Sequence, residues 1–270
     1  MALESKTPRA RPRVGVVGGG FSGLWCVRAL HRAPVDVTLI DRTNHHLFQP
    51  LLYQVATAGL SAPDIAAPLR HILRGQPNVV VRLGDVMDVD LAGRAVHLAD
   101  GARIAYDHLL VAAGATHAYF GRDDWAPHAP GLKTLDDALE LRRRLLLAFE
   151  RAEHADDPAK REAWLTFAII GGGPTGVDLA GTLAEIARHT LRREFRQIDP
   201  ASARVLLVEA GPRVLSSFPE VLSQRAQQQL EALGVQVLTG SPVQHIDASG
   251  FDRAGQHTPA RTVLWAAGVA

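Results

Sequence analysis

Two glycine-rich segments carry the residues whose spacing points most directly to chemistry. Each reads G-x-G-x-x-G between an apolar run and an amphipathic stretch: Gly18, Gly20 and Gly23 in the first, Gly171, Gly173 and Gly176 in the second. In a strand–turn–helix, such glycines permit a tight turn, close approach of a pyrophosphate, and close packing of helix on strand. Unpaired N–H groups at the positive end of the helix dipole then bind the phosphates. We interpret both segments as dinucleotide-phosphate loops.

An acidic residue ends the apolar run that follows each loop. We expect Asp41 and Glu209 to accept hydrogen bonds from ribose hydroxyls. An acid there also repels a 2′-phosphate, which favours NADH over NADPH at the second loop. Arg213 would weaken this preference, although a surface role in the turn after Gly211-Pro212 is favoured. Arg42 would matter for a 2′-phosphate only if the first site held NADP.

The two loops belong to an internal repeat. The first glycines lie 153 residues apart (171 − 18), and the glycines that end the copies, Gly114 and Gly268, lie 154 apart (268 − 114). This predicts an α/β fold of two Rossmann-like units, with parallel sheets and short antiparallel hairpins, one of them at Asp100-Gly101. The expected parallel strands are 14–17, 35–40, 79–83 and 109–111, then 167–170, 205–208, 235–238 and 263–265.

Each copy carries one insertion. The first copy has a surplus of 12 residues that falls within residues 45–70. The second has a surplus of 15 around residues 188–202, expected as a longer helix and loop. The first copy is the better flavin candidate, because a flavin ring needs extra chain to enclose it. We therefore assign 1–160, with a linking helix, to FAD and 161–270 to NADH. Hydride transfer between two bound cofactors follows from this pairing.

The linking helix is predicted over residues 134–154. Thr134 and Asp137 form a capping-box start. We expect its buried face to be formed by apolar residues at helical spacing, namely Leu135, Leu139, Leu146 and Phe149.

Composition excludes several classes of protein. Lys+Arg 29 against Asp+Glu 28 gives a net charge of +1, which argues against nucleic-acid binding. The single cysteine, Cys26, excludes an internal disulfide and a cysteine-based zinc site, so no metal is expected. We expect Cys26 to be a small core residue. The first 13 residues lack the apolar core of a secretory signal, and no apolar run approaches the roughly 18 residues that span a bilayer.

One longer stretch is more specific than either loop. Residues 46–70, HLFQPLLYQVATAGLSAPDIAAPLR, resemble the signature of type II NADH dehydrogenases, the non-pumping NADH:quinone oxidoreductases; GATHAYFG, APGLKTLDDALELRRR, GGGPTGV and VEAGPRVL resemble the same family. The resemblance runs from about Arg13 to the end of the chain. It implies a two-dinucleotide flavoprotein in which NADH reduces FAD and the flavin reduces a quinone. It also implies a peripheral protein at the cytoplasmic face of the membrane.

The resemblance also implies roles for individual residues. FAD would be held by the first loop and its neighbours, namely Gly18, Gly20, Phe21, Ser22, Gly23, Asp41, Arg42, Val86 and Gly114, with Gln49, Pro50 and Leu51 along the isoalloxazine ring. NADH would be held by Gly171, Gly173, Gly176, Glu209 and Gly268.

Two residues depart from the family pattern. Asp178 stands where the family usually has Glu, and we place it in the first turn of the helix, near the nicotinamide–flavin contact. There it would assist proton or charge balance, or simply compensate the helix dipole. His45 stands where relatives usually have Tyr, and with His46 beside it a structural or surface role is favoured over a proton relay.

The chain ends at Ala270, before the point where the family would return to the first domain with a strand carrying a Gly-Asp pair. We therefore expect a C-terminally incomplete chain that is soluble as given. Membrane contact is expected through segments beyond Ala270. Both a monomer and a homodimer are compatible with the sequence. Two alternatives remain. One is a soluble flavoprotein reductase for an iron–sulfur or ferric acceptor, and the other is a truncated nucleotide-binding module without turnover.

Overall fold

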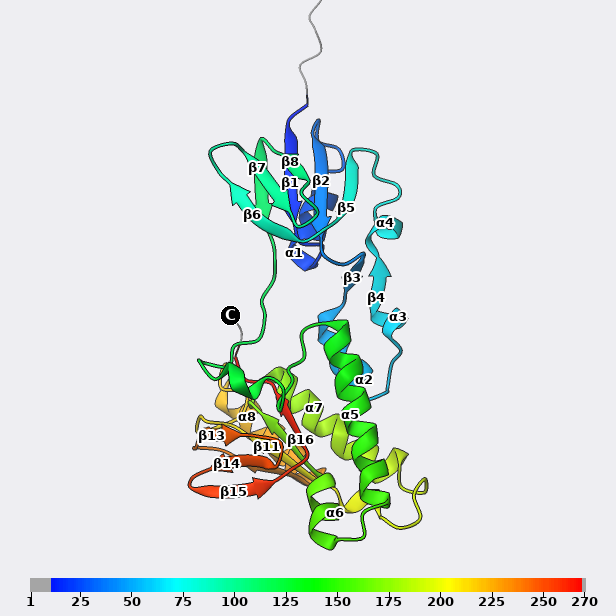
Figure 1. The fold of residues 1–270 in the computed structure, drawn as a ribbon, viewed down its shortest axis with the longest axis vertical. Helices are drawn as coiled ribbons and strands as arrows, with labels where there is room; N and C mark the ends of the chain where they lie inside the picture. Colours follow the sequence, from blue (N-terminus) through cyan, green and yellow to red (C-terminus); the bar gives the residue numbers. More distant parts are fainter. Residues whose placement is uncertain (1–10, 269–270) are drawn as a thin grey trace, which may run out of the picture. The chain divides into compact units, whose positions relative to one another are not determined.

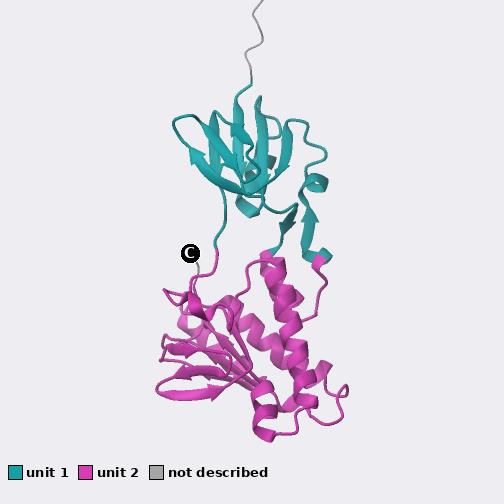
Figure 2. Cartoon of the chain, viewed as in Figure 1, with its two compact units in different colours: residues 1–48, 63–115 teal, residues 49–62, 116–270 magenta. Residues whose placement is uncertain are grey.

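A computed structural model describes residues 11–268. The first ten residues, part of the stretch expected not to be a secretory signal, lie outside the described residues, as does Ala270. The chain divides into two compact units (Figure 2): unit 1 comprises residues 1–48 and 63–115, and unit 2 comprises residues 49–62 and 116–270. The linking helix belongs to unit 2. Assignment of FAD to 1–160 and NADH to 161–270 stays a prediction.

Unit 1 is built on a parallel sheet (Figure 1). Its strands are β1 (Arg13–Val17), β2 (Asp36–Asp41), β5 (Val79–Leu83) and β9 (His108–Val111), in the order β5-β2-β1-β9. Helix α1 (Phe21–Ala29) buries Leu24 and Val27 against this sheet, and Cys26 packs partly buried on the same core. A second, antiparallel sheet contains β6 (Val86–Asp90), β7 (Ala95–Leu98) and β8 (Arg103–Ala105). The hairpin predicted at Asp100-Gly101 joins β7 to β8 and is confirmed.

Unit 2 repeats this plan. Strands β10 (Thr166–Ile170), β11 (Arg204–Val208), β12 (Val235–Leu238) and β16 (Thr262–Trp265) form a parallel sheet in the order β12-β11-β10-β16. An antiparallel sheet contains β13 (Val243–Ile246), β14 (Gly250–Arg253) and β15 (Gln256–Pro259). All eight predicted parallel strands are observed, with ends within one residue of the prediction. The internal repeat is therefore a repeat of structure.

Four α-helices within residues 116–268 belong to unit 2, and all but α6 are longer than α1. They are α5 (Leu135–Glu153), α6 (Pro158–Trp164), α7 (Pro174–Glu185) and α8 (Glu220–Ala232). Short turns of helix complete the unit at η2 (Asp123–Trp125), η3 (Ile186–Thr190) and η4 (Pro200–Ser202). A π-helical turn, η3, extends α7 into the second predicted insertion, as the sequence predicted for a longer helix. No helix within residues 11–268 is long and apolar enough to cross a membrane.

The first insertion divides between the two units. Strand β3 (His45–Leu47) pairs with β4 (Ala66–Pro68) in unit 1, and α4 (Leu69–Ile72) follows. The intervening chain forms η1 (Gln49–Leu51) and α2 (Leu52–Ala56), then α3 (Ala62–Ile65). Helix α2 packs against α5 and α7 and buries apolar side chains there, namely Leu52, Val55 and Ala56. Apolar burial on these helices explains why residues 49–62 belong to unit 2.

Helix α5 begins with the predicted capping box, because the Thr134 side chain accepts from the Asp137 N–H and Asp137 accepts from the Thr134 N–H. Its predicted buried face is wrong in part. Phe149 is buried, but Leu139 and Leu146 remain exposed. The buried stripe consists instead of Ala138, Leu141, Leu145, Ala148, Phe149 and Ala152. This stripe also follows helical spacing, and alanines at three positions let α5 approach its neighbours closely.

Candidate functional site

The first glycine loop connects β1 to α1 in a conformation that requires glycine. Gly18 has a φ of +103°, and its N–H donates to the Ile40 carbonyl at 2.8 Å. A Cβ on Gly18 would lie 2.1 Å from the Ala112 carbonyl oxygen, and one on Gly23 would lie 1.8 Å from the Gly18 oxygen. A Cβ on Gly20 would meet nothing within 4 Å. The first and third glycines are thus needed by the fold, whereas the second leaves open space beside the backbone.

The second loop, between β10 and α7, has the same geometry. Gly171 has a φ of +114°, and its N–H donates to the Val208 carbonyl at 2.7 Å. A Cβ on Gly176 would lie 1.9 Å from the Gly171 oxygen, and one on Gly173 would again meet nothing within 4 Å. In both loops, therefore, the fold requires the first and third glycines, and the second glycine leaves open space beside the backbone.

Each loop ends at a helix whose first N–H groups have no partner within the helix. Gly20 caps α1 and Gly173 caps α7, and neither has a side chain that could satisfy these donors. Intrahelical bonding starts at the Leu24 N–H in α1 and at the Val177 N–H in α7. Free donors at the positive end of a helix dipole beside an open glycine are suited to bind phosphate.

Each of the two acidic residues accepts a hydrogen bond from the backbone of the glycine loop in its own copy. Asp41, at the end of β2, accepts from the Gly19 N–H at 2.5 Å and from the Thr43 N–H at 2.6 Å. Glu209, directly after β11, accepts from the Gly172 N–H at 2.6 Å and from the Gly211 N–H at 2.7 Å. Each carboxylate oxygen has two lone pairs, so both residues keep acceptor capacity for ribose hydroxyls.

Arg213 is engaged away from Glu209. Its guanidinium donates to the carbonyl oxygens of Leu215, Ser216 and Phe218 at 2.7–3.3 Å, which ties together the turn before α8. This bears out the interpretation of Arg213 as a residue of the turn.

Asp178 lies at the fifth position of α7, so the placement in the first helical turn is wrong; the first turn of α7 contains no acidic residue. This weakens the view of Asp178 as a carboxylate that compensates the helix dipole, since that effect falls off beyond the first turn. The carboxyl is still reached by solvent, yet desolvation by the surrounding protein raises its pKa. No hydrogen bond or ion pair within residues 11–268 offsets this cost.

The remaining predicted residues fall in both units. Unit 1 contains the residues predicted to lie around the first loop. Phe21, Ser22 and Arg42 are exposed, Val86 is at the start of β6, and Gly114 has a φ of +77°. Unit 2 contains Gln49, Pro50 and Leu51 in η1, where the Gln49 amide donates to the Lys133 carbonyl at 3.1 Å. Gly268 has a φ of +89°, and a Cβ there would lie 2.4 Å from the Phe120 ring.

Sequence reasoning missed the role of His46. Its Nδ1 lies 3.0 Å from the Gly19 carbonyl oxygen, and its ring makes an edge contact with Phe21 at 5.0 Å between centroids. His46 thus connects the first glycine loop to β3. No spacing pattern pointed to this contact, because 27 residues separate the two partners.

The chain contains two parallel sheets, and each carries a glycine loop hydrogen-bonded to an acidic residue. This arrangement defines a tandem dinucleotide-binding α/β protein. The model of the pyridine nucleotide-disulphide oxidoreductase family matches residues 12–270, and the chain belongs to this family.

Individual relatives confirm the resemblance read from the sequence. The chain is 48% identical over 270 residues to the type II NADH:quinone oxidoreductase Ndh of Mycobacterium tuberculosis, covering 97% of this chain and 58% of the relative. It is 29% identical to the demethylphylloquinone reductase NdbB of Synechocystis, covering 96% of this chain and 62% of the relative. Among solved structures, NDH2 of Plasmodium falciparum matches with a TM-score of 0.89 at 23% identity, over 96% of this chain and 55% of that one. The chain thus spans about 60% of the length of these two curated relatives.

Proposed function

We propose that this protein is an FAD-dependent NADH:quinone oxidoreductase in which the first glycine loop holds FAD and the second holds NADH. One observation carries the proposal: a chain with two such loops is 48% identical, over almost its whole length, to a type II NADH:quinone oxidoreductase. The family description, a pyridine nucleotide oxidoreductase, supports the use of a nicotinamide cofactor. Quinone as acceptor, a peripheral place on the membrane and a homodimer belong to the same proposal.

The residues present fit two dinucleotides. Open space at Gly20 and Gly173 lets a pyrophosphate approach the backbone, and the uncapped first turns of α1 and α7 supply its donors. Asp41 and Glu209 keep lone pairs for ribose hydroxyls while accepting from loop amides. We assign FAD to the first loop because β3, β4 and the helices between them occur only in this copy.

Bound FAD would supply the chemistry that connects hydride transfer from NADH to electron transfer to the quinone. The task of this chain is to hold both dinucleotides in a productive orientation and to exclude water from the reacting atoms. The Asp41 and Glu209 carboxylates do this by rigidly linking each loop to the strand that precedes the acid. The His46 contact with the Gly19 carbonyl adds a second link for the first loop only.

The second loop favours NADH over NADPH. The Glu209 carboxylate would repel a 2′-phosphate, and Arg213, the nearest arginine in sequence, already donates to three carbonyls of its own turn. No guanidinium from that turn is left to compensate the repulsion.

We place Asp178 beside the nicotinamide as a group that balances charge. A partly desolvated carboxyl with a raised pKa takes up a proton more readily than an ordinary aspartate. Its position in the second turn of α7 keeps it clear of the phosphate-binding N–H groups.

Purification of the full chain tests the proposal. We expect one flavin per chain by absorbance, and NADH oxidation that depends on a menaquinone or ubiquinone analogue. A chain that binds NADH without retaining added FAD would support the non-catalytic alternative. Electron transfer to a ferredoxin-like protein or ferric complex, without quinone reduction, would instead identify a soluble reductase. Either result would overturn the proposal.

A further inference from the structure

Unit 2 contains a cavity of about 300 Å³ that none of the glycine-loop residues lines. Its wall comes from four separate segments: the loop before α5, helix α5, helix α6 and the sheet β13-β14-β15 with its connection to β16. The lining residues are Pro127, His128, Arg144, Lys160, Trp164, Asp247, Ala248, Ala260 and Arg261. The volume is at the lower end of the range for small-molecule sites.

Cationic side chains dominate this lining. Within residues 11–268, neither Lys160 nor Arg261 forms an ion pair with a carboxylate. Arg144 pairs with Glu140 at 2.7 Å, but Arg143 shares the same carboxylate. Two positive charges therefore line the cavity without an ion-pair partner among the described residues, and a third shares its carboxylate with Arg143.

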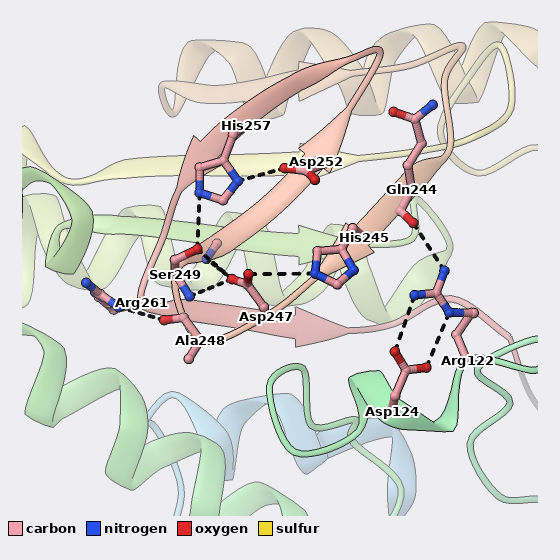
Figure 3. A network of polar contacts seen from close by, with 11 residues as sticks. Arg122, Asp124, Gln244, His245, Asp247, Ala248, Ser249, Asp252, His257 and Arg261 are labelled. Atoms are coloured by element: carbon pink, nitrogen blue, oxygen red, sulfur yellow. Dashed lines mark hydrogen bonds and ion pairs between the residues drawn. The ribbon is translucent and has the colours of Figure 1, made fainter.

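The two guanidinium groups are held in place by backbone carbonyls. Arg261 donates to the Ala248 oxygen at 2.7 Å, a bond drawn in Figure 3, and Arg144 donates to the Pro127 oxygen at 3.2 Å and 3.3 Å. A guanidinium has five N–H donors, so each keeps donors for an anion. Because the carbonyls orient these side chains beforehand, less conformational entropy is lost on binding.

One carboxylate, Asp247, also lines the cavity, but its charge is directed to its own turn. Figure 3 shows its oxygens bound to Ser249 and facing His245. One oxygen accepts from the Ser249 N–H and hydroxyl at 2.7 Å and 2.6 Å, and from the Gly250 N–H at 3.2 Å. These hydrogen bonds lower the pKa of Asp247 to about 2, so its carboxylate stays ionised and offsets one of the three positive charges that line the cavity.

The remaining wall is apolar apart from His128. Trp164, the last residue of α6, is half-buried, and Pro127 and Ala260 complete this side. An aromatic ring can stack on the Trp164 indole, while the nearby cations attract a negative group that the ring carries.

We propose that this cavity binds a small phosphorylated molecule whose phosphate contacts Arg144, Lys160 and Arg261 and whose flat ring packs on Trp164. Arginine and lysine together match a phosphate dianion, since guanidinium forks give directional bonds and the ammonium adds a point charge. A phosphate has enough oxygens to contact cations from three segments at once, which a monocarboxylate lacks. This site is independent of the dinucleotide loops and of the proposed redox reaction.

Phenyl phosphate is the probe, because it has the phosphate and the ring but no adenosine. Calorimetric titration uses the full chain, with FAD and NAD⁺ added in excess so that the glycine loops are occupied. We expect saturable binding of phenyl phosphate, weaker binding of inorganic phosphate, and no binding of phenol. No saturable binding of phenyl phosphate up to about 10 mM, equivalent to roughly 3 kcal/mol of affinity, overturns the proposal.

Single substitutions identify the site. Lys160→Gln and Arg261→Gln should each weaken phenyl phosphate binding about tenfold, the loss expected for one charge-assisted contact. Arg225→Gln, a matched change on the exposed face of α8, should leave it unchanged. Trp164→Leu should weaken phenyl phosphate but not inorganic phosphate. Unaltered binding in both Lys160→Gln and Arg261→Gln, with normal circular dichroism, would show that the anion binds elsewhere and would refute the proposal.

Discussion

The glycine loops of units 1 and 2 share their backbone geometry, whereas the parallel sheets that carry them differ in the solvent exposure of their strand residues. Gly18 and Gly171 have φ values of +103° and +114°, and the closest Cβ approaches at the third glycines differ by 0.1 Å. Yet β10 and β16 are buried throughout, while Val80 in β5 and Val111 in β9 are 64% and 61% exposed. The comparison teaches that loop geometry follows from local backbone constraints, and strand burial from what else packs on the sheet.

A second difference concerns how the acid is held. Asp41 is shorter than Glu209, and both the N–H and the hydroxyl of Thr43 bind its outer oxygen, whereas the Gly211 N–H alone does so for Glu209. His46 further links the first loop to β3. The acid of the first loop thus accepts one more hydrogen bond than that of the second, and within residues 11–268 only the first loop has a histidine contact.

The third glycine of each loop provides the strongest test of the comparison. Gly23→Ala and Gly176→Ala each force a methyl group against a carbonyl oxygen at less than 2 Å. We expect a cost of about 3 kcal/mol at each loop, near the top of the range for overpacking, or roughly a hundredfold in affinity. Gly23→Ala should lose flavin, and Gly176→Ala should keep flavin but lose NADH binding.

Flavin absorbance and NADH titration measure both effects. Gly173→Ala serves as the control, because its methyl group meets only open space in the protein and should disturb NADH without disturbing the fold. Equal loss of flavin in both third-glycine variants would show that the loops do not serve separate cofactors.

Glu209→Gln tests whether only the acid of the second loop determines the preference for NADH over NADPH. Glutamine has one acceptor oxygen, so the Gly172 or Gly211 N–H loses its partner and the repulsion of a 2′-phosphate disappears. We expect KM for NADH to rise about tenfold, as for a lost charged hydrogen bond, and the preference for NADH over NADPH to narrow. In steady-state assays Asp41→Asn should leave that preference unchanged; a similar change in both variants would contradict the assignment of the second loop to NADH.

The capping box of α5 tests a contact that fixes the start of the longest helix of unit 2. Although desolvation raises the pKa of Asp137, hydrogen bonds from His117, Lys133 and Thr134 outweigh it and lower the pKa to about 2. Its stabilisation is therefore present above the ordinary pKa of 3.8 and lost as pH falls toward 2.

Asp137→Ala should cost about 1 kcal/mol of the free energy of unfolding at pH 7, as for a lost helix cap. The cost should shrink below pH 4 in urea unfolding experiments. Asp136→Ala, in the same first turn but outside the capping box, is the matched control. An equal cost for the two alanines at pH 7 would rule out the capping contribution.

Asp178→Asn should have the smallest effect on stability. Desolvation raises the pKa of Asp178, so the folded state holds its proton to higher pH than the unfolded state, and its charge destabilises the fold as pH rises through the folded pKa. Removal of this charge should stabilise the protein slightly at pH 7, by no more than about 0.5 kcal/mol for so exposed a group, and not at pH 3. Thermal unfolding at both pH values measures this; destabilisation at pH 7 would mean that the carboxylate has a partner.

Much of the fold and of each loop could be predicted from the sequence, because the signals are local. A φ near +100° demands glycine, buried parallel strands need continuous apolar runs, and Thr134 with Asp137 encodes a helix start within four residues. The face of α5 could not be predicted in the same way. Its two apolar stripes both follow helical spacing, and the elements packed on α5, among them α2, α6 and β16, determine which stripe is buried.

The sequence by itself determined that this chain has two dinucleotide loops with an acid for each, since glycine geometry and strand periodicity depend on short stretches of chain. Only the tertiary structure decided that residues 49–62 pack with unit 2 and that His46 binds the Gly19 carbonyl. It alone also gathers Arg144, Lys160 and Arg261 around one cavity. These contacts join residues that lie on separate elements of the fold, and no local spacing rule relates such residues to one another.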